Sequence, residues 1–177
     1  MSPHYSLASV AETERLGRAV GERLGPGDVV VLSGPLGAGK TVLARGIGRG
    51  LGVRGPVTSP TFVIAREHPP LPGGRGVALV HVDAYRLGGL AELDDLDLDT
   101  DLLTAAVVVE WGEGMAERLA DEHLLIQLER PGDGPGDETG DDGRRVAWLR
   151  GPARLMPKLA SAGFGPAPLP TRAPHLT

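Results

Sequence analysis

A glycine-rich stretch that ends in lysine and threonine is the part of this sequence best suited to chemistry. Residues 34–41 read Gly-Pro-Leu-Gly-Ala-Gly-Lys-Thr, which fits the phosphate-binding pattern G-x-x-x-x-G-K-[ST]. Glycines let backbone N–H groups approach phosphate oxygens, and a following helix adds partial positive charge at its start. Lys40 would bridge the β- and γ-phosphates of a nucleotide, and Thr41 would place a hydroxyl on Mg²⁺. The stretch therefore predicts a site for a nucleoside triphosphate with Mg²⁺.

The choice of residues narrows this prediction. The chain has two lysines and sixteen arginines, yet a lysine occupies position 40, where the planar fork of arginine would not replace a compact ammonium group. Asparagine is absent, so the N-K-x-D loop that reads guanine cannot form, and ATP is the expected nucleotide. The alternative is a glycine-rich turn, without a ligand, in a glycine-rich protein.

Two carboxylates end apolar runs that read as buried strands. Asp83 follows residues 77–82 and Glu110 follows residues 105–109. Parallel strands would bring both residues to the sheet edge that carries the phosphate-binding loop. We expect one of them in the magnesium shell and the other in positioning or sensing water. The sequence leaves open which is which, and each could instead be a solvated strand end.

Further candidates lie near these positions in the sequence. A hydroxyl of residues 59–61 (Ser-Pro-Thr) could sense the γ-phosphate as switch loops do, and Tyr85 and Arg86 could contact nucleotide or a partner. Trp111 directly follows Glu110, and His81 lies on the same run as Asp83. Core packing is the competing interpretation for Trp111 and His81.

The elements around these residues predict an α/β fold. We expect a single P-loop NTPase domain over residues 1–151, with a mostly parallel central sheet flanked by helices and a C-terminal antiparallel strand pair. Residues 152–177 form a predicted extension, largely disordered apart from a possible short helix over 153–162. The expected helices are 10–24, 40–51, turns within 90–103, and 113–120; the expected strands are 28–33, 62–66, 77–83, 105–110, 123–129 and 144–150.

Composition sets limits on partners and location. A formal net charge of −5 argues against broad wrapping of nucleic acid, and the absence of cysteine excludes disulfides and thiol chemistry. We see no signal peptide in residues 1–25 and no apolar run of the ~20 residues that span a membrane. These features predict a cytoplasmic protein that does not contact membranes.

The ordered motifs resemble those of the TsaE (YjeE) family, bacterial ATPases needed for threonylcarbamoyladenosine (t6A) in tRNA. The resemblance covers about residues 5–150. Beyond the generic glycine-rich loop it rests on three specific blocks: Val-Thr-Ser-Pro-Thr-Phe at 57–62, His-Val-Asp-Ala-Tyr-Arg-Leu at 81–87 and Val-Glu-Trp at 109–111. Pro35 departs from the acidic residue of many relatives, in a variable part of the loop.

The resemblance implies an ATPase that is weak alone and acts on a TsaB–TsaD complex, with tRNA reached only through that complex. It implies Lys40, Asp83 and Glu110 as catalytic residues. Thr41, Glu110 and Asp83 are implied for Mg²⁺, and Arg144 and Arg145 resemble a basic pair that approaches phosphate. The residues implied for ATP are Gly37, Ala38, Gly39, Lys40, Thr41, Val42, Ser59, Thr61 and Trp111.

Two other functions share the same loop and carboxylates. A small-molecule kinase would need an arginine-rich lid, whereas the long loops here are rich in proline and glycine. A nucleotide-gated binding module would bind ATP without meaningful turnover. The acceptor of the phosphoryl group, or the need for hydrolysis, distinguishes these functions from the ATPase.

Overall fold

The computed structural model describes residues 4–59, 64–86, 90–96, 98–114, 119–131, 143–156 and 164. Its strands are β1 (His4–Leu7), β2 (Val29–Ser33), β3 (Ala65–His68), β4 (Ala78–Asp83), β5 (Ala105–Glu110), β6 (Leu124–Glu129) and β7 (Arg145–Arg150). Its helices are α1 (Val10–Gly21), α2 (Lys40–Leu51), α3 (Leu90–Asp94) and α4 (Leu98–Asp101), with a 3-10 turn, η1, at Ala84–Arg86.

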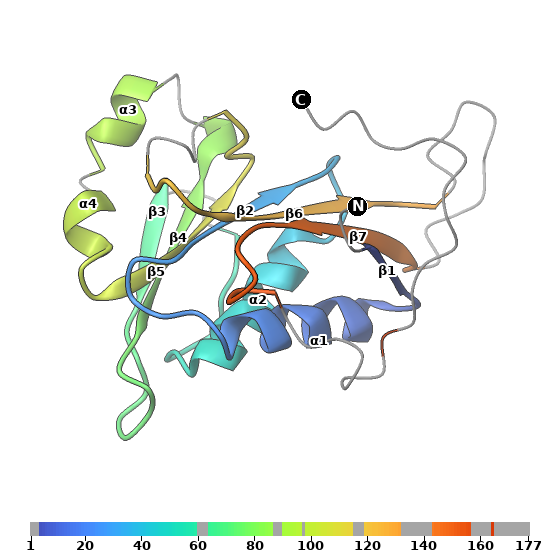
Figure 1. Ribbon diagram of the computed structural model, residues 1–177, viewed down its shortest axis with the longest axis horizontal. Helices are drawn as coiled ribbons and strands as arrows, with labels where there is room; N and C mark the ends of the chain where they lie inside the picture. Colours follow the sequence, from blue (N-terminus) through green and yellow to red (C-terminus); the bar gives the residue numbers. More distant parts are fainter. Residues whose placement is uncertain are drawn as a thin grey trace.

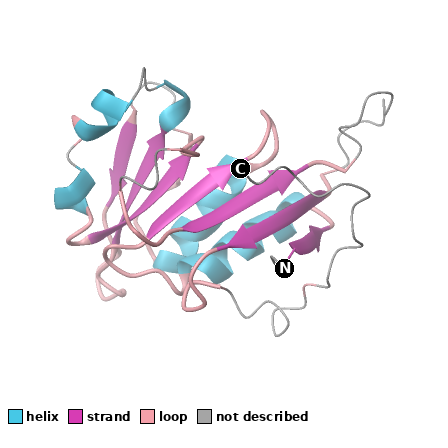
Figure 2. Cartoon of the chain, turned by 45° about the horizontal axis from the view of Figure 1, so that its top comes forward, coloured by secondary structure: helices cyan, strands magenta, loops and turns pink. Residues whose placement is uncertain are grey.

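One seven-stranded sheet organises the molecule (Figure 2). Its order is β1-β7-β6-β2-β5-β4-β3. The four central strands, β6, β2, β5 and β4, run parallel, whereas β3, β7 and β1 join antiparallel at the two sides. The sheet is therefore mixed, which corrects the prediction of a mostly parallel sheet. The predicted C-terminal antiparallel pair is confirmed as β6 and β7.

The central strands are buried on both faces, which explains why they carry almost no polar residues. On one face, the side chains of α1 and α2 pack with Val30 and Leu32 of β2 and with alternate residues of the other strands. On the other face, Val29 and Val31 pack with valines of β4 and β5 and with Leu98 of α4. A strand buried on both faces reads as a continuous apolar run, as these do. Figure 1 shows α1 and α2 side by side against the sheet.

Helices α1 and α2 approach each other so closely that only glycine fits at their crossing. A Cβ atom on Gly17 would lie 2.2 Å from the carbonyl oxygen of Leu43. A Cβ on Gly46 would lie 2.1 Å from the carbonyl oxygen of Glu14. Because α2 carries the glycine-rich loop at its start, this contact fixes the loop relative to α1.

The boundaries of several elements differ from the sequence predictions. The strand predicted at 62–66 is β3 at Ala65–His68, and β1 was not predicted. Residues 62–63 of the predicted strand lie outside the described residues. So do residues 115–118, which form the middle of the predicted helix 113–120. Residues 153–156 form turns, whereas 157–162 of that predicted helix lie outside the described residues.

Some described residues beyond position 151 belong to the main core. Leu155 and Phe164 are buried in the cluster formed with α1 and α2. The Nε of Arg23 donates to the carbonyl oxygen of Met156 at 2.9 Å. The division at residue 151 stays a prediction. Of the helices described, none is long and apolar enough to cross a membrane.

Candidate functional site

The glycine-rich loop joins the end of β2 to the start of α2. Gly34 has a φ of 135° and Gly39, the N-cap of α2, has a φ of 100°. These positive values are readily adopted by glycine and are strained for other residues. A Cβ on Gly34 would also lie 2.3 Å from the carbonyl oxygen of Leu128. Since the N-cap has no side chain, the first N–H groups of α2 are available to an anion.

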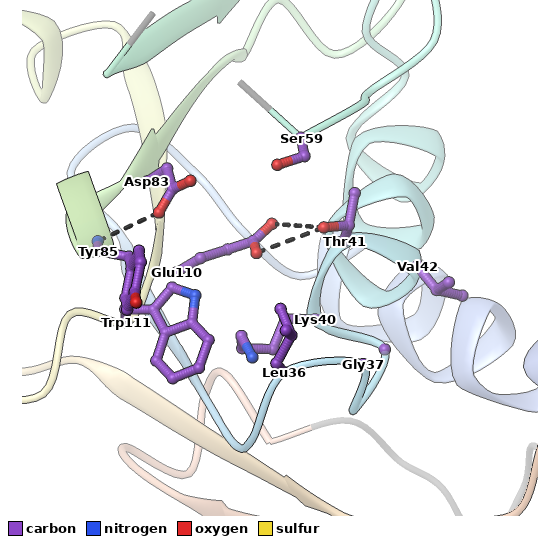
Figure 3. A pocket seen from close by; sticks show the side chains of 11 residues that line it. Leu36, Gly37, Lys40, Thr41, Val42, Ser59, Asp83, Tyr85, Glu110 and Trp111 are labelled. Atoms are coloured by element: carbon purple, nitrogen blue, oxygen red, sulfur yellow. Dashed lines mark hydrogen bonds between the residues drawn. The ribbon is translucent and has the colours of Figure 1, made fainter. Parts of the chain in front are cut away.

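The loop forms one wall of an open cavity of about 990 Å³ (Figure 3). The cavity brings together residues from the loop, α2, the segment before β3, and the ends of β4 and β5. Ala38, predicted to contact nucleotide, is buried and does not line the cavity, and Thr61 lies outside the described residues. The described lining residues are Leu36, Gly37, Gly39, Lys40, Thr41, Val42, Ser59, Asp83, Tyr85, Glu110 and Trp111.

Lys40 lies between the loop backbone and an aromatic ring. Its Nζ donates to the carbonyl oxygens of Gly34 at 2.7 Å and Pro35 at 2.9 Å. The same Nζ lies 3.7 Å from the ring centroid of Trp111, within cation–π range. Burial lowers the pKa of Lys40, and the carboxylates of Glu110 and Asp83 partly oppose that change. The ammonium group is therefore held next to the acidic side of the cavity.

Glu110 connects the start of α2 with the interior of the sheet. The hydroxyl of Thr41 donates to its carboxylate, with distances of 3.1 Å to Oε1 and 3.4 Å to Oε2. The Nε2 atom of His81, on the neighbouring strand β4, lies 2.8 Å from Oε1. His81 is fully buried and Glu110 is 4% exposed. A carboxylate is thereby placed beside a hydroxyl at the head of a helix.

Asp83 and Trp111 lie at the ends of two adjacent parallel strands. Asp83 is paired in register with Glu110, and its Oδ1 accepts a hydrogen bond from the backbone N–H of Tyr85 at 3.1 Å. Trp111 has a φ of 62°, and among the described residues it is the one non-glycine with positive φ. That conformation turns its indole over Lys40, where it also contacts the Tyr85 ring at 5.3 Å between centroids. Strained backbone at a cavity is typical of functional sites.

Arg145 of β7 donates hydrogen bonds to the backbone of the loop, whereas the sequence had indicated it only as one of a basic pair near phosphate. Its Nε donates to the carbonyl oxygen of Ala38 at 2.8 Å, and one Nη donates to that of Gly37 at 3.0 Å. It is 6% exposed. The sequence signal for this role is that Arg145 lies on the same buried face of β7 as Ala147 and Leu149. An inward arginine needs buried acceptors.

The oxygen donors of the cavity fit Mg²⁺. Thr41 offers a hydroxyl, and Glu110 and Asp83 offer carboxylates, all at one end of the sheet. Mg²⁺ prefers oxygen ligands and is commonly held by one or two carboxylates together with substrate phosphates and water. In the described ranges, no group of three or more acidic, histidine or cysteine side chains could hold a metal by itself. Bound phosphate would therefore have to supply part of the coordination.

Comparisons with known proteins give one family. Residues 7–137 match the model described as "Threonylcarbamoyl adenosine biosynthesis protein TsaE". The protein of that name from Mycobacterium tuberculosis is 60% identical over 131 residues, covering 71% of this chain and 77% of the relative. Its Streptomyces coelicolor counterpart is 59% identical over 132 residues, covering 74% and 85%.

A solved structure supports the same conclusion. The crystal structure of YdiB from Bacillus subtilis superposes with a TM-score of 0.62 at 29% sequence identity. The superposition covers 88% of this chain and 89% of that chain. The likeness therefore extends over most of both molecules.

Proposed function

The chain belongs to the TsaE family, which takes part in the biosynthesis of threonylcarbamoyladenosine in tRNA, and on that premise we propose that it is a P-loop ATPase. It binds ATP with Mg²⁺ at residues 34–41. It acts on a complex of TsaB and TsaD, and it reaches tRNA only through that complex. It does so in the cytoplasm.

The observation that carries this proposal is the convergence of one ammonium group, one hydroxyl and two carboxylates around the start of α2. Lys40 and Thr41 come from α2, whereas Asp83 and Glu110 end two adjacent parallel strands. The ammonium group and the free N–H groups of the helix suit the phosphates. The hydroxyl and the carboxylates suit Mg²⁺, which would neutralise charge on the phosphates and orient them.

In hydrolysis, the oxygen of a water molecule attacks the γ-phosphorus and the bond to the bridging oxygen of ADP breaks, giving ADP and inorganic phosphate. Asp83 is suited to orient that water, because it lines the cavity at the end of β4, where the backbone N–H of Tyr85 donates to its Oδ1. Lys40 holds the β- and γ-phosphates while their charge shifts.

We propose that the isolated chain hydrolyses ATP weakly. Among the described residues that line the cavity, Lys40 is the one cation. A second cation at the transferring phosphoryl group can raise turnover by roughly 10³–10⁵-fold in P-loop enzymes. We propose that the TsaB–TsaD complex stimulates turnover, and that hydrolysis resets the complex between rounds of threonylcarbamoyl transfer by TsaD.

The proposal is tested by measuring ATP–Mg²⁺ binding by calorimetry and phosphate release with and without TsaB–TsaD. Lys40→Ala should weaken binding by at least tenfold, because a charge-assisted bond of about 1.5–3 kcal/mol is lost. Lys40→Arg should restore little of the lost binding affinity, since a guanidinium group does not match the position of the ammonium group. Arg18→Ala, which removes an exposed ion pair with Glu22 at the end of α1, is the matched control and should leave binding unchanged.

Three results would contradict the proposal. The first is wild-type protein that binds no ATP with Mg²⁺, and the second is equal binding by wild type and Lys40→Ala. The third is transfer of phosphate to an added metabolite and not to water, which would favour the kinase. Binding to TsaB–TsaD that does not change with nucleotide would remove the part of the proposal that concerns the complex.

A further inference from the structure

His81 is a buried imidazole whose one hydrogen bond among the described residues reaches the proposed magnesium site. It lies on β4 with no exposed surface, and its Nε2 is 2.8 Å from Oε1 of Glu110. A carboxylate that holds a metal ion accepts hydrogen bonds, so the His81 tautomer with its proton on Nε2 would donate to Glu110. The other ring nitrogen, Nδ1, is buried and has no hydrogen-bond partner among the described residues.

Packing alone does not explain a histidine at this position. The rest of the run 77–82 is apolar, and a leucine or valine would fill the interior without burying an unpaired nitrogen atom. Burying a polar atom without a partner destabilises the folded state. The bond from Nε2 to Glu110 is the feature of His81 that an aliphatic side chain could not supply.

We propose that His81 is a positioning residue that orients the carboxylate of Glu110 for the cation bound with ATP. This inference rests on the proposed function. His81 fixes Oε1, and Thr41 contacts Oε1 more closely than Oε2. With Oε1 held by two donors, the carboxylate cannot rotate freely and Oε2 keeps capacity to accept further contacts. Donors behind a metal-binding carboxylate typically change metal affinity by 10–100-fold when removed.

The chain supplies a matched control in His68. This histidine lies on β3, next to β4, and is also buried, with 5% of its surface exposed. Its Nε2 has no hydrogen-bond partner among the described residues. Replacing His68 therefore removes a buried imidazole near His81 without removing a donor to Glu110.

The experiment measures how much Mg²⁺ a fluorescent ATP analogue requires for binding, and how tightly the analogue binds in excess EDTA. His81→Leu should raise the half-saturating Mg²⁺ concentration by about 10–100-fold and leave binding in EDTA unchanged. His81→Gln, whose amide can place an N–H near the Nε2 position, should recover most of the Mg²⁺ affinity. His68→Leu should behave as wild type in both titrations.

The glutamine and asparagine variants keep the test decisive if the leucine variant does not fold, which circular dichroism would show. His81→Asn carries the same amide on a shorter side chain, so it should require as much Mg²⁺ as predicted for His81→Leu. An unchanged Mg²⁺ requirement in both His81→Leu and His81→Asn would overturn the inference. Equal changes in His81→Gln and His81→Asn, or in His81→Leu and His68→Leu, would also overturn it.

Failure of the inference is distinguishable from failure of the proposed function. If wild type binds the analogue with Mg²⁺ and Lys40→Ala does not, while the His81 variants are unchanged, only the role of His81 is wrong. If wild type binds no analogue, the proposed function fails and the role of His81 fails with it.

Discussion

Lys40 and Trp111 show how single residues shape the cavity. The ammonium group of Lys40 satisfies two loop carbonyls and faces the indole ring, and burial lowers its pKa. A triphosphate would compete for this ammonium group with the Gly34 and Pro35 carbonyls and with the ring. The ring of Trp111 also contacts the ring of Tyr85. The two side chains should therefore respond together to phosphate.

We predict that the fluorescence of Trp111 changes when ATP and Mg²⁺ bind. The reason is that its ring contacts the one described cation of the cavity, whose environment changes with phosphate. The chain has two tryptophans, and the second, Trp148, lies on β7 and stacks on His4. In an emission titration with ATP–Mg²⁺, Trp148→Phe should keep the change and Trp111→Phe should lose it. A change that survives in Trp111→Phe would contradict the proposed position of the phosphates.

Sequence reasoning selected most of the residues that line the cavity because their motifs are local. Residues 34–41 are contiguous, and Asp83 and Glu110 each end an apolar run, so the strand rule alone placed them together. The hydrogen bonds from Arg145 to the loop were not predicted, because their acceptors, the carbonyls of Gly37 and Ala38, are about a hundred residues away in the chain. The roles of the selected residues stay predictions.

At the scale of elements, the position of the loop depends on the contact between α1 and α2. The loop ends where α2 begins, and α2 packs against α1 through glycines on both helices. The first turn of α1 is fixed in turn by Ser9, whose hydroxyl oxygen accepts from the backbone N–H of Glu12 at 3.2 Å. A shift of α2 away from α1 would move Lys40 and Thr41 relative to Glu110.

We predict that Gly46→Ala destabilises the protein by roughly 1–3 kcal/mol, because the added methyl group would force the two helix backbones apart. The free energy of unfolding from urea titration measures this effect. Binding of ATP should weaken in the same variant, since the start of α2 moves with the helix.

The control for this substitution is Gly25→Ala. A Cβ at Gly25 would meet only a carboxylate oxygen of Asp28, at 3.9 Å, and its φ is not positive. Its stability should change by less than that of Gly46→Ala. Equal destabilisation by the two alanines would show that loss of glycine, and not the helix crossing, sets the effect.

The helices and strands that could be predicted are those whose sequence pattern is local. The helix at 40–51 and the strand at 105–110 are confirmed at their predicted bounds, because a glycine loop and an unbroken apolar run mark them. Strand β1 is four residues long and is stabilised by pairing with distant β7, so the sequence offers no periodic signal for it. Three antiparallel pairings make the sheet mixed: β1–β7, β3–β4 and the predicted β6–β7. Propensity does not encode the first two.

At the scale of the whole molecule, the sheet separates two buried apolar clusters, and other buried residues are polar and can link stability to pH. His68 belongs to this set, since it is 5% exposed at the end of β3. Burial lowers the pKa of His68, and the charges of His81 (when protonated) and Arg66 lower it further. A hydrogen bond with the backbone of Arg54 acts in the opposite direction. The folded state therefore favours the neutral form of this imidazole.

We predict that His68 makes the folded protein less stable as the pH falls below neutral. In the unfolded chain a histidine has a pKa of about 6.5, so below that pH the unfolded state binds a proton that folded His68 still excludes. The stability contributed by neutral His68 is fully present above pH ~6.5 and decreases as the pH falls toward its lowered folded pKa. The slope from one such group cannot exceed about 1.4 kcal/mol per pH unit.

Urea unfolding between pH 7.5 and 5.5 should show a steeper loss of stability in wild type than in His68→Leu. The other histidines titrate in both proteins, so the difference between the two pH profiles reports on His68 alone. Parallel profiles would mean that folded His68 accepts a proton as readily as it does in the unfolded chain, which would contradict the prediction.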